Sequence, residues 1–131
     1  MKSTNYTVTI GSFAERHYIK LFSKKYKEAW NITFRTIKEE FGQVDLLFPR
    51  NIAETIVAGG VIKICKTEFK IAGTNESRHG SGNRCIIAVN GELKEVCVLL
   101  VYSKTDLSGH NETAEWKKII KDNYIAYKDI L

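Results

Sequence analysis

The strongest constraint on the fold lies in Ser81–Lys104, where two apolar runs flank a short polar connection. The runs Cys85–Val89 and Val96–Tyr102 are rich in β-branched and aliphatic residues, and the connection Asn90–Glu95 opens with Asn-Gly, a common tight-turn signal. This pattern predicts a β-hairpin. The second run is apolar on both alternating faces, which favours a strand that is covered on both sides within a sheet.

A cation stands at each end of this predicted hairpin. Arg84 precedes the first run and Lys104 follows the second. Antiparallel pairing brings the start of one strand beside the end of the other. We therefore expect the two positive charges to share one edge of the sheet.

Two helices are predicted before the hairpin, after a short first strand at residues 6–10. Ser12 and Glu15 fit a capping box, which starts a helix that runs from about residue 13 to residue 24 or 25. The positions of this helix expected to face inward are Phe13, His17 and Leu21, with Phe22 as a further candidate. The second helix carries an apolar stripe at helical spacing, formed by Trp30, Phe34, Ile37 and Phe41.

The middle of the chain is harder to interpret. Within Asp45–Gly60, the apolar run Ile52–Ala58 is compatible with one helical turn or with a loop. A long strand at residues 61–72 follows, and its apolar phase shifts along its length, which predicts a bulge near residues 65–67. The face of this strand opposite the core is expected to carry Lys66, Glu68 and Lys70.

A polar loop and a final helix complete the predicted elements. The loop at residues 73–82 is rich in Gly, Ser and Asn and carries Arg78 and His79, so we expect it to be mobile and to reach toward a ligand. Asn111 or Thr113 is suited to cap the last helix, from about residue 113 to residue 127. Its aromatic side should pack on the sheet or against a partner.

These elements predict the α+β class, with a small antiparallel sheet of about four strands. The N-terminal two-helix hairpin covers one face, and a C-terminal helix follows the sheet. The length of 131 residues fits a single domain over residues 1–131. The formal net charge of +5 favours polyanionic partners without identifying one.

The cysteines and the N-terminus indicate the compartment. Three cysteines, an odd number without Cys-x-x-Cys spacing, are typical of reduced and mostly buried thiols in a reducing compartment. The first residues lack the apolar segment of a signal peptide, and no run reaches membrane-spanning length. We expect a soluble cytoplasmic protein without a metal or another cofactor.

The order of elements, together with three local features, resembles the RelE/ParE toxin superfamily of bacterial type II toxin–antitoxin systems. These features are the charged strand face at Glu68–Lys70, the Ser-Gly-Asn-Arg sequence at 81–84, and Tyr102–Lys104 at the end of the last strand. The resemblance covers nearly the whole chain and favours the RelE-like branch. It implies a ribosome-dependent mRNA endonuclease that is neutralised by a cognate antitoxin protein.

The resemblance also implies roles for single residues. Arg84 stands where the family has the Arg that opens the middle strand, and Lys70 and Lys66 match basic residues of the preceding strand. Lys104 falls on the basic end of the last strand. Thr105 departs from the pattern, because RelE-like members often have another Arg there.

Metal-independent RNA cleavage requires a base for the 2′-hydroxyl, cations for the phosphate, and an acid for the leaving 5′-oxygen. A guanidinium matches phosphate oxygens with its planar fork, which makes Arg84 the best candidate to clamp the scissile phosphate. The candidates for base or acid are His110 and His79, then Tyr102 and Lys70. The predicted catalytic residues are Arg84, Lys70, Lys104 and His110, and the predicted RNA-binding residues are Lys66, Arg78, His79 and Tyr102.

Two alternatives share the same pattern. A ParE-like toxin binds gyrase and cleaves no RNA, and an inactive toxin-fold protein acts only as an interaction partner. Lysines along a strand face are more often simply solvated than catalytic. The general base and acid, the codon preference, the identity of the antitoxin and the oligomeric state stay open at this stage.

Overall fold

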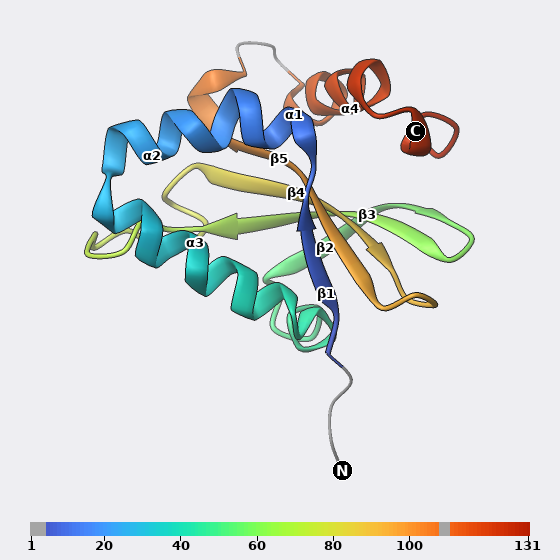
Figure 1. Cartoon of the computed structure of the whole chain (residues 1–131), viewed down its shortest axis with the longest axis horizontal. Coiled ribbons are helices and arrows are strands. Elements are labelled where there is room, and N and C mark those ends of the chain that lie inside the picture. The colour runs from blue at the N-terminus through green and yellow to red at the C-terminus, as the bar shows by residue number, and fades with distance from the viewer. Residues whose placement is uncertain (1–4, 108–110) are drawn as a thin grey trace.

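The computed structural model describes residues 5–107 and 111–131. A five-stranded sheet in the order β1-β5-β4-β3-β2 forms the centre of the molecule (Figure 1). The strands are β1 (Thr7–Ile10), β2 (Ala53–Gly59), β3 (Ile62–Phe69), β4 (Asn83–Asn90) and β5 (Glu95–Ser103). The sheet is mixed, because β1 runs parallel to β5 while the other neighbouring strands are antiparallel.

The predicted hairpin is confirmed as β4 and β5, which both lie inside the sheet. The side chains of β4 are buried from Asn83 to Val89, and those of β5 from Val98 to Tyr102. Their register shifts once, since Ile86 pairs with Leu100 while Ile87 pairs with Val98. Burial on both faces explains why both runs are almost continuously apolar.

The predicted α+β class is confirmed, but the sheet has five strands rather than about four, and it is not fully antiparallel. The additional strand is β2, which forms from the segment that was compatible with a helical turn or a loop. As an edge strand, β2 pairs with β3 alone, and of its seven residues three are exposed and three, Ile56 among them, are only partly buried. Its sequence therefore lacks the clear apolar alternation of a half-buried strand.

The bulge predicted near residues 65–67 is wrong. β3 pairs with β4 in continuous register from Ile62 to Phe69, and the irregularity lies instead in β2, between Thr55 and Val57. The apparent phase shift arises because helices cover both faces of β3. Ile64 packs toward one helical layer and Cys65 toward the other.

The first helix differs from its predicted form. It consists of α1 (Ser12–Ala14), a π-helical segment at Glu15–Ile19, and α2 (Lys20–Tyr26). The predicted capping box is wrong, because Gly11 occupies the N-cap position and no side chain caps the helix. The wider π turn changes which side chains face the sheet. Phe22 is buried, whereas Leu21 is 61% exposed and the predicted inward position of His17 is exposed too.

The second predicted helix is confirmed as α3 (Glu28–Phe41). Trp30, Ile37 and Phe41 are buried, and Phe34 is partly buried and stacks on Trp30 with ring centroids 5.1 Å apart. Thr33 also faces inward, where its hydroxyl accepts a hydrogen bond from the Ala72 amide at 2.7 Å. That bond ties α3 to the chain that follows β3.

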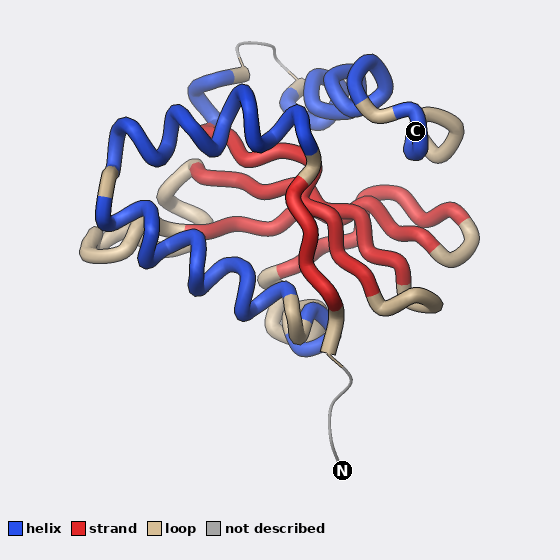
Figure 2. The backbone as a smooth tube through the Cα atoms, in the orientation of Figure 1, coloured by secondary structure: helices blue, strands red, loops and turns tan. Residues whose placement is uncertain are grey.

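Two apolar cores lie on opposite faces of the sheet. One lies under α2 and α3, which run side by side over the sheet in Figure 1, and contains Trp30, Ile37, Phe69 and Val101. The other lies under α4 (Glu112–Asn123), where Trp116 and Ile120 pack on sheet residues, and Figure 2 shows the strands between these helices. Asn111 caps α4 as predicted, since its side chain accepts a hydrogen bond from the Ala114 amide. None of the helices in the described ranges combines the length and apolarity needed to cross a membrane.

Candidate functional site around Arg84

Three polar side chains form one row across the sheet, on the face that α4 covers. Antiparallel register places Glu68 of β3 opposite Arg84 of β4, and Arg84 opposite Tyr102 of β5. Residues that pair across neighbouring strands point to the same face of a sheet. Glu112, the first residue of α4, completes the group from above the sheet.

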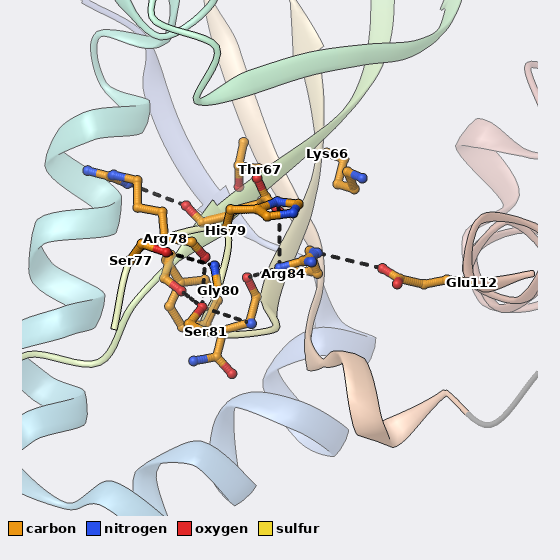
Figure 3. Close-up of polar contacts among 12 residues, drawn as sticks. Lys66, Thr67, Ser77, Arg78, His79, Gly80, Ser81, Arg84 and Glu112 are labelled. Atoms are coloured by element: carbon orange, nitrogen blue, oxygen red, sulfur yellow. Dashed lines mark hydrogen bonds and ion pairs between the residues drawn. The ribbon is translucent and has the colours of Figure 1, made fainter. Parts of the chain in front are cut away.

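The Arg84 guanidinium lies between the carboxylates of Glu68 and Glu112, and Figure 3 shows its contact with Glu112. Its Nη1 is 3.1 Å from Glu68 Oε2, and its Nε is 3.8 Å from Glu112 Oε2. Nη1 also donates to the Asn83 carbonyl at 3.3 Å. The Arg84 side chain is 6% exposed, so the ion pairs link β3, β4 and the start of α4 in a largely desolvated position.

The charge of Arg84 is therefore compensated. One guanidinium faces two carboxylates, and Arg84 Nε is buried without a hydrogen-bond acceptor among the described residues. A buried ion pair is favourable only when its geometry repays the cost of desolvation. The longer of the two contacts is the one with Glu112, whose Oε2 also accepts the hydrogen bond from the Tyr102 hydroxyl.

Tyr102 acts as a hydrogen-bond donor in this group. Its hydroxyl donates to Glu112 Oε2 at 2.5 Å, and the side chain is almost fully buried. Burial, and then the hydrogen bond and negative charge of Glu112, raise the pKa of Tyr102 well above its usual value. The phenol thus stays protonated at neutral pH and cannot serve there as a base.

His79 lies at the solvent-exposed end of the group. Its Nδ1 is 2.7 Å from Glu68 Oε2, the same oxygen that contacts Arg84, and its side chain is 85% exposed. The Gly- and Ser-rich loop before β4 presents this imidazole at the surface beside the guanidinium, as Figure 3 shows.

The loop that carries His79 is fastened to the rest of the molecule, in contrast to the mobile loop expected from its composition. Arg78 makes a two-pronged contact with Glu40 of α3, with Nη1–Oε1 at 3.2 Å and Nη2–Oε2 at 2.5 Å. The Ser81 hydroxyl hydrogen-bonds the carbonyls of Phe69 at 2.5 Å and Arg78 at 2.8 Å. These contacts surround His79 in sequence and restrict its position.

The other predicted site residues are dispersed. Lys66 lies two positions from Glu68 on β3, as expected, with Nζ 3.9 Å from Glu54 Oε1. Lys70 lies past the end of β3 and lines a pocket with Glu40 and Arg78, among other residues, beside α3.

Lys104 begins a 3-10 turn at Lys104–Asp106, and its amide donates to the Gly82 carbonyl at 2.6 Å. Its backbone therefore lies at the predicted edge. Its side chain is exposed, whereas the Arg84 side chain is buried against carboxylates. His110 lies outside the described residues.

Glu68 and Glu112 were not among the predicted site residues. Glu68 becomes a partner of Arg84 through the β3–β4 register, and an unbroken β3 was not expected. Glu112 was expected only near the positive end of the last helix, where carboxylates are common. Across the described ranges, no group of three or more His, Cys, Asp or Glu side chains is arranged to hold a metal ion.

The comparisons with known proteins place this geometry in a fold. No family model and no curated protein matches the sequence. The structure is similar to a chain in the crystal structure of the archaeal RelE–RelB complex from Pyrococcus horikoshii OT3, with a TM-score of 0.50. The match covers 79% of this chain and 99% of that chain.

The chain has a RelE-like fold. The identity over the match is only 15%, so the similarity is one of fold. The resemblance of the element order to the RelE/ParE superfamily is thereby confirmed for the fold. The RelE-like sheet presents the row Glu68, Arg84 and Tyr102 on one face, with α4 above it.

Proposed function

We propose that the chain is the toxin of a toxin–antitoxin pair and acts as a ribosome-dependent mRNA endonuclease in the cytoplasm. The observation that carries the proposal is the RelE-like fold with Arg84 set in the middle of one sheet face. The similar structure is that of a RelE–RelB complex, which supports a cognate antitoxin as a partner. The whole chain, residues 1–131, is proposed to act as one domain.

The charges around Arg84 are compatible with an RNA ligand. The chain has a formal net charge of +5, and Lys66 on the same sheet face and Lys104 at its edge are within the exposed or half-exposed surface. Lysines of this kind attract a phosphate backbone without reading its sequence. A scissile phosphate that replaces the Glu112 carboxylate provides Arg84 with an equivalent anionic partner. Cleavage needs no metal in this proposal, because the guanidinium stabilises the phosphate charge.

A second candidate function is a binding toxin of the gyrase-poisoning type. The observation that favours it is the burial of Arg84, whose side chain is 6% exposed and already ion-paired with two carboxylates. In such a toxin the buried ion pairs have a structural role, and the exposed lysines form a contact surface.

Controlled expression followed by primer-extension mapping of transcripts separates the two candidates. The endonuclease predicts growth arrest with mRNA cut within codons, and loss of both effects in the Arg84→Lys variant, which retains a charge but not the planar fork. Lys118→Ala is a matched control, since Lys118 is exposed on α4 and pairs there with the exposed Asp122. Arrest with intact mRNA contradicts the endonuclease proposal and supports the binding toxin.

A further inference from the structure

We propose that His79, positioned by Glu68, is the proton-transferring group of the site and that its substrate is single-stranded RNA held with one phosphate at Arg84. The inference rests on the endonuclease proposed above. It assigns the reaction to a contact that the sequence did not indicate, between the exposed imidazole and a strand carboxylate.

The orientation of the imidazole is the first support. Glu68 Oε2 lies 2.7 Å from His79 Nδ1, which is a short hydrogen bond to a carboxylate. A carboxylate on Nδ1 favours the tautomer that carries its proton there and leaves Nε2 as the acceptor. Nε2 has no partner in the described parts of the chain, and the side chain is 85% exposed. The accepting nitrogen is thus open to a ligand.

The position of the imidazole beside Arg84 is the second support. Both side chains contact the same oxygen, Glu68 Oε2, at 2.7 Å for His79 and 3.1 Å for Arg84. His79 Nδ1 and Arg84 Nη1 are therefore held close together by the oxygen that they share. In RNA, the 2′-oxygen and the adjacent phosphate are only a few bonds apart, so a base and a phosphate clamp must be close neighbours.

The other ionisable groups beside the imidazole are each held by a charged partner. The pKa of Tyr102 is raised well above its usual value by burial and by Glu112. Glu68 and Glu112 both contact the Arg84 guanidinium. Arg78, adjacent to His79 in the loop, is paired with Glu40. Among the described groups at this site, His79 alone combines an 85% exposed side chain with a ring nitrogen that can accept and release a proton.

The fastening of the loop is the third support. Contacts from Arg78 to Glu40 and from Ser81 to the Phe69 carbonyl hold the residues on either side of His79. A catalytic group gains rate when it is held in place before the substrate arrives. An imidazole that is merely exposed to solvent requires neither the contact with the Glu68 carboxylate nor a loop held in place.

The step proposed for the pair is balanced in atoms and charge. His79 Nε2 takes the proton from the 2′-hydroxyl, and the 2′-oxygen forms a bond to phosphorus. The bond from phosphorus to the 5′-oxygen breaks, and the leaving oxygen takes a proton from solvent. The products are a 2′,3′-cyclic phosphate and a free 5′-hydroxyl. Arg84 stabilises the negative charge on the phosphate, and Glu68 stabilises the imidazolium.

The test measures single-turnover cleavage of mRNA on ribosomes by the purified full chain. His79→Gln preserves a hydrogen-bond donor for Glu68 but cannot accept a proton, so we expect the rate to fall by about 100-fold or more. Because His79 is exposed, the variant should fold as the wild type does. His17→Gln is the matched control, since His17 is exposed on the first helix, with its ring beside that of Phe13. A His79→Gln rate within about threefold of wild type overturns the proposal.

Glu68 is tested as a positioning residue. Glu68→Gln should lower kcat by about tenfold or more and change KM much less, while Glu68→Asp recovers part of the rate. A rise in KM with an unchanged kcat would mean that Glu68 acts only in binding, and would overturn this role. His110→Gln is run beside them, and a loss there with full activity in His79→Gln refutes the assignment to His79.

The result for the wild type separates this inference from the proposed function. If the wild-type chain leaves ribosome-bound mRNA intact, the endonuclease proposal fails. If the wild type cuts and His79→Gln cuts as well, the endonuclease stands and only the role of His79 is refuted. Whenever the wild type cuts, mapping the cut ends for a 2′,3′-cyclic phosphate checks the chemistry, and a 3′-hydroxyl end refutes it.

Discussion

Arg84 and Glu112 meet where β4 passes under the first turn of α4, with Nε and Oε2 3.8 Å apart. This contact joins the centre of the sheet to the C-terminal helix. On the other side of the same guanidinium, Glu68 approaches to 3.1 Å. The residue expected to bind phosphate is thus also a structural residue, and its variants must be interpreted on both counts.

Replacing Arg84 should reduce stability as well as activity. Arg84→Ala leaves the Glu68 and Glu112 carboxylates without their cation, and we expect the free energy of unfolding to fall by about 2–4 kcal/mol, somewhat less than for a fully buried pair. Arg84→Lys should lose about half as much. Urea denaturation at pH 7 measures both. Equal stability of Arg84→Ala and wild type would mean that these ion pairs contribute nothing to folding.

Removal of the Tyr102 hydroxyl should destabilise the contact with α4. Tyr102→Phe retains the packed ring but loses the 2.5 Å hydrogen bond to Glu112, and we expect a cost of about 1.5–3 kcal/mol for a bond to a charged group. Tyr26→Phe, at a half-buried position in α2, is the matched control and should change stability by less than about 0.5 kcal/mol. Thermal and urea denaturation measure the difference, and identical losses in the two variants would contradict the expectation.

The π-helical segment predicts opposite outcomes at two adjacent residues. Phe22→Ala should lower the free energy of unfolding by about 3–5 kcal/mol, because Phe22 is 6% exposed and stacks on Trp30. Leu21→Ala should cost less than about 1 kcal/mol, since Leu21 is 61% exposed. In a regular α-helix with Leu21 facing inward, Leu21→Ala would be the more destabilising variant. Chemical denaturation of both variants therefore distinguishes the π-helical segment from a regular helix.

Stability should decline at alkaline pH because of buried thiols. Burial raises the pKa of Cys65 to about 11 and that of Cys85 to about 12, whereas the pKa of a thiol in the unfolded chain is about 8.5. Above that pH the unfolded chain binds fewer protons than the folded chain, so stability that is fully present at lower pH is lost as pH rises toward the folded pKa values. Urea denaturation from pH 7 to pH 11 should show this decline.

A variant tests the source of the alkaline decline. Cys85→Ala is expected to be less stable at pH 7, because a buried side chain is shortened, but to lose less stability between pH 8.5 and pH 11. Curves that run parallel for the variant and the wild type would exclude the Cys85 thiol as a contributor.

Breaking the loop anchor should loosen the segment around His79. Arg78→Ala removes both contacts with Glu40, and we expect faster proteolysis within residues 73–82 and slower RNA cleavage. Arg35→Ala, at an exposed position of the same helix as Glu40, is the control. Unchanged proteolysis in Arg78→Ala would show that other contacts hold the loop.

The parts of the fold that followed from the sequence are those in which one physical signal dominates. The β4–β5 hairpin was predictable because two apolar runs flank a turn, and α3 because its apolar stripe has helical spacing. β2 was not predictable, since an edge strand with mixed exposure shows no clear period. The π-helical segment was also missed, because the sequence fits a regular helix equally well and only packing selects between them.

The candidate site was predictable only in part. Arg84 and Lys66 lie on the expected sheet face. The side chains that contact the Arg84 guanidinium, however, are the carboxylates of Glu68 and Glu112, whereas Lys70 and Lys104 were the expected neighbours. Pairwise contacts of this kind depend on strand register and on where α4 begins, and neither is written in local sequence patterns. Whether the predicted catalytic and RNA-binding residues have those roles stays a prediction.

The parallel pairing of β1 with β5 affects how the chain folds during its synthesis. Thr7 lies beside Glu95 and Ile10 beside Val98, so the first strand to be synthesised waits for the last one before it finds its neighbour. Chains emerge from their N-terminus, and contacts between distant segments form late. The edge of the sheet next to β5 is therefore completed only after β5 has left the ribosome, and β1 has no strand neighbour until then.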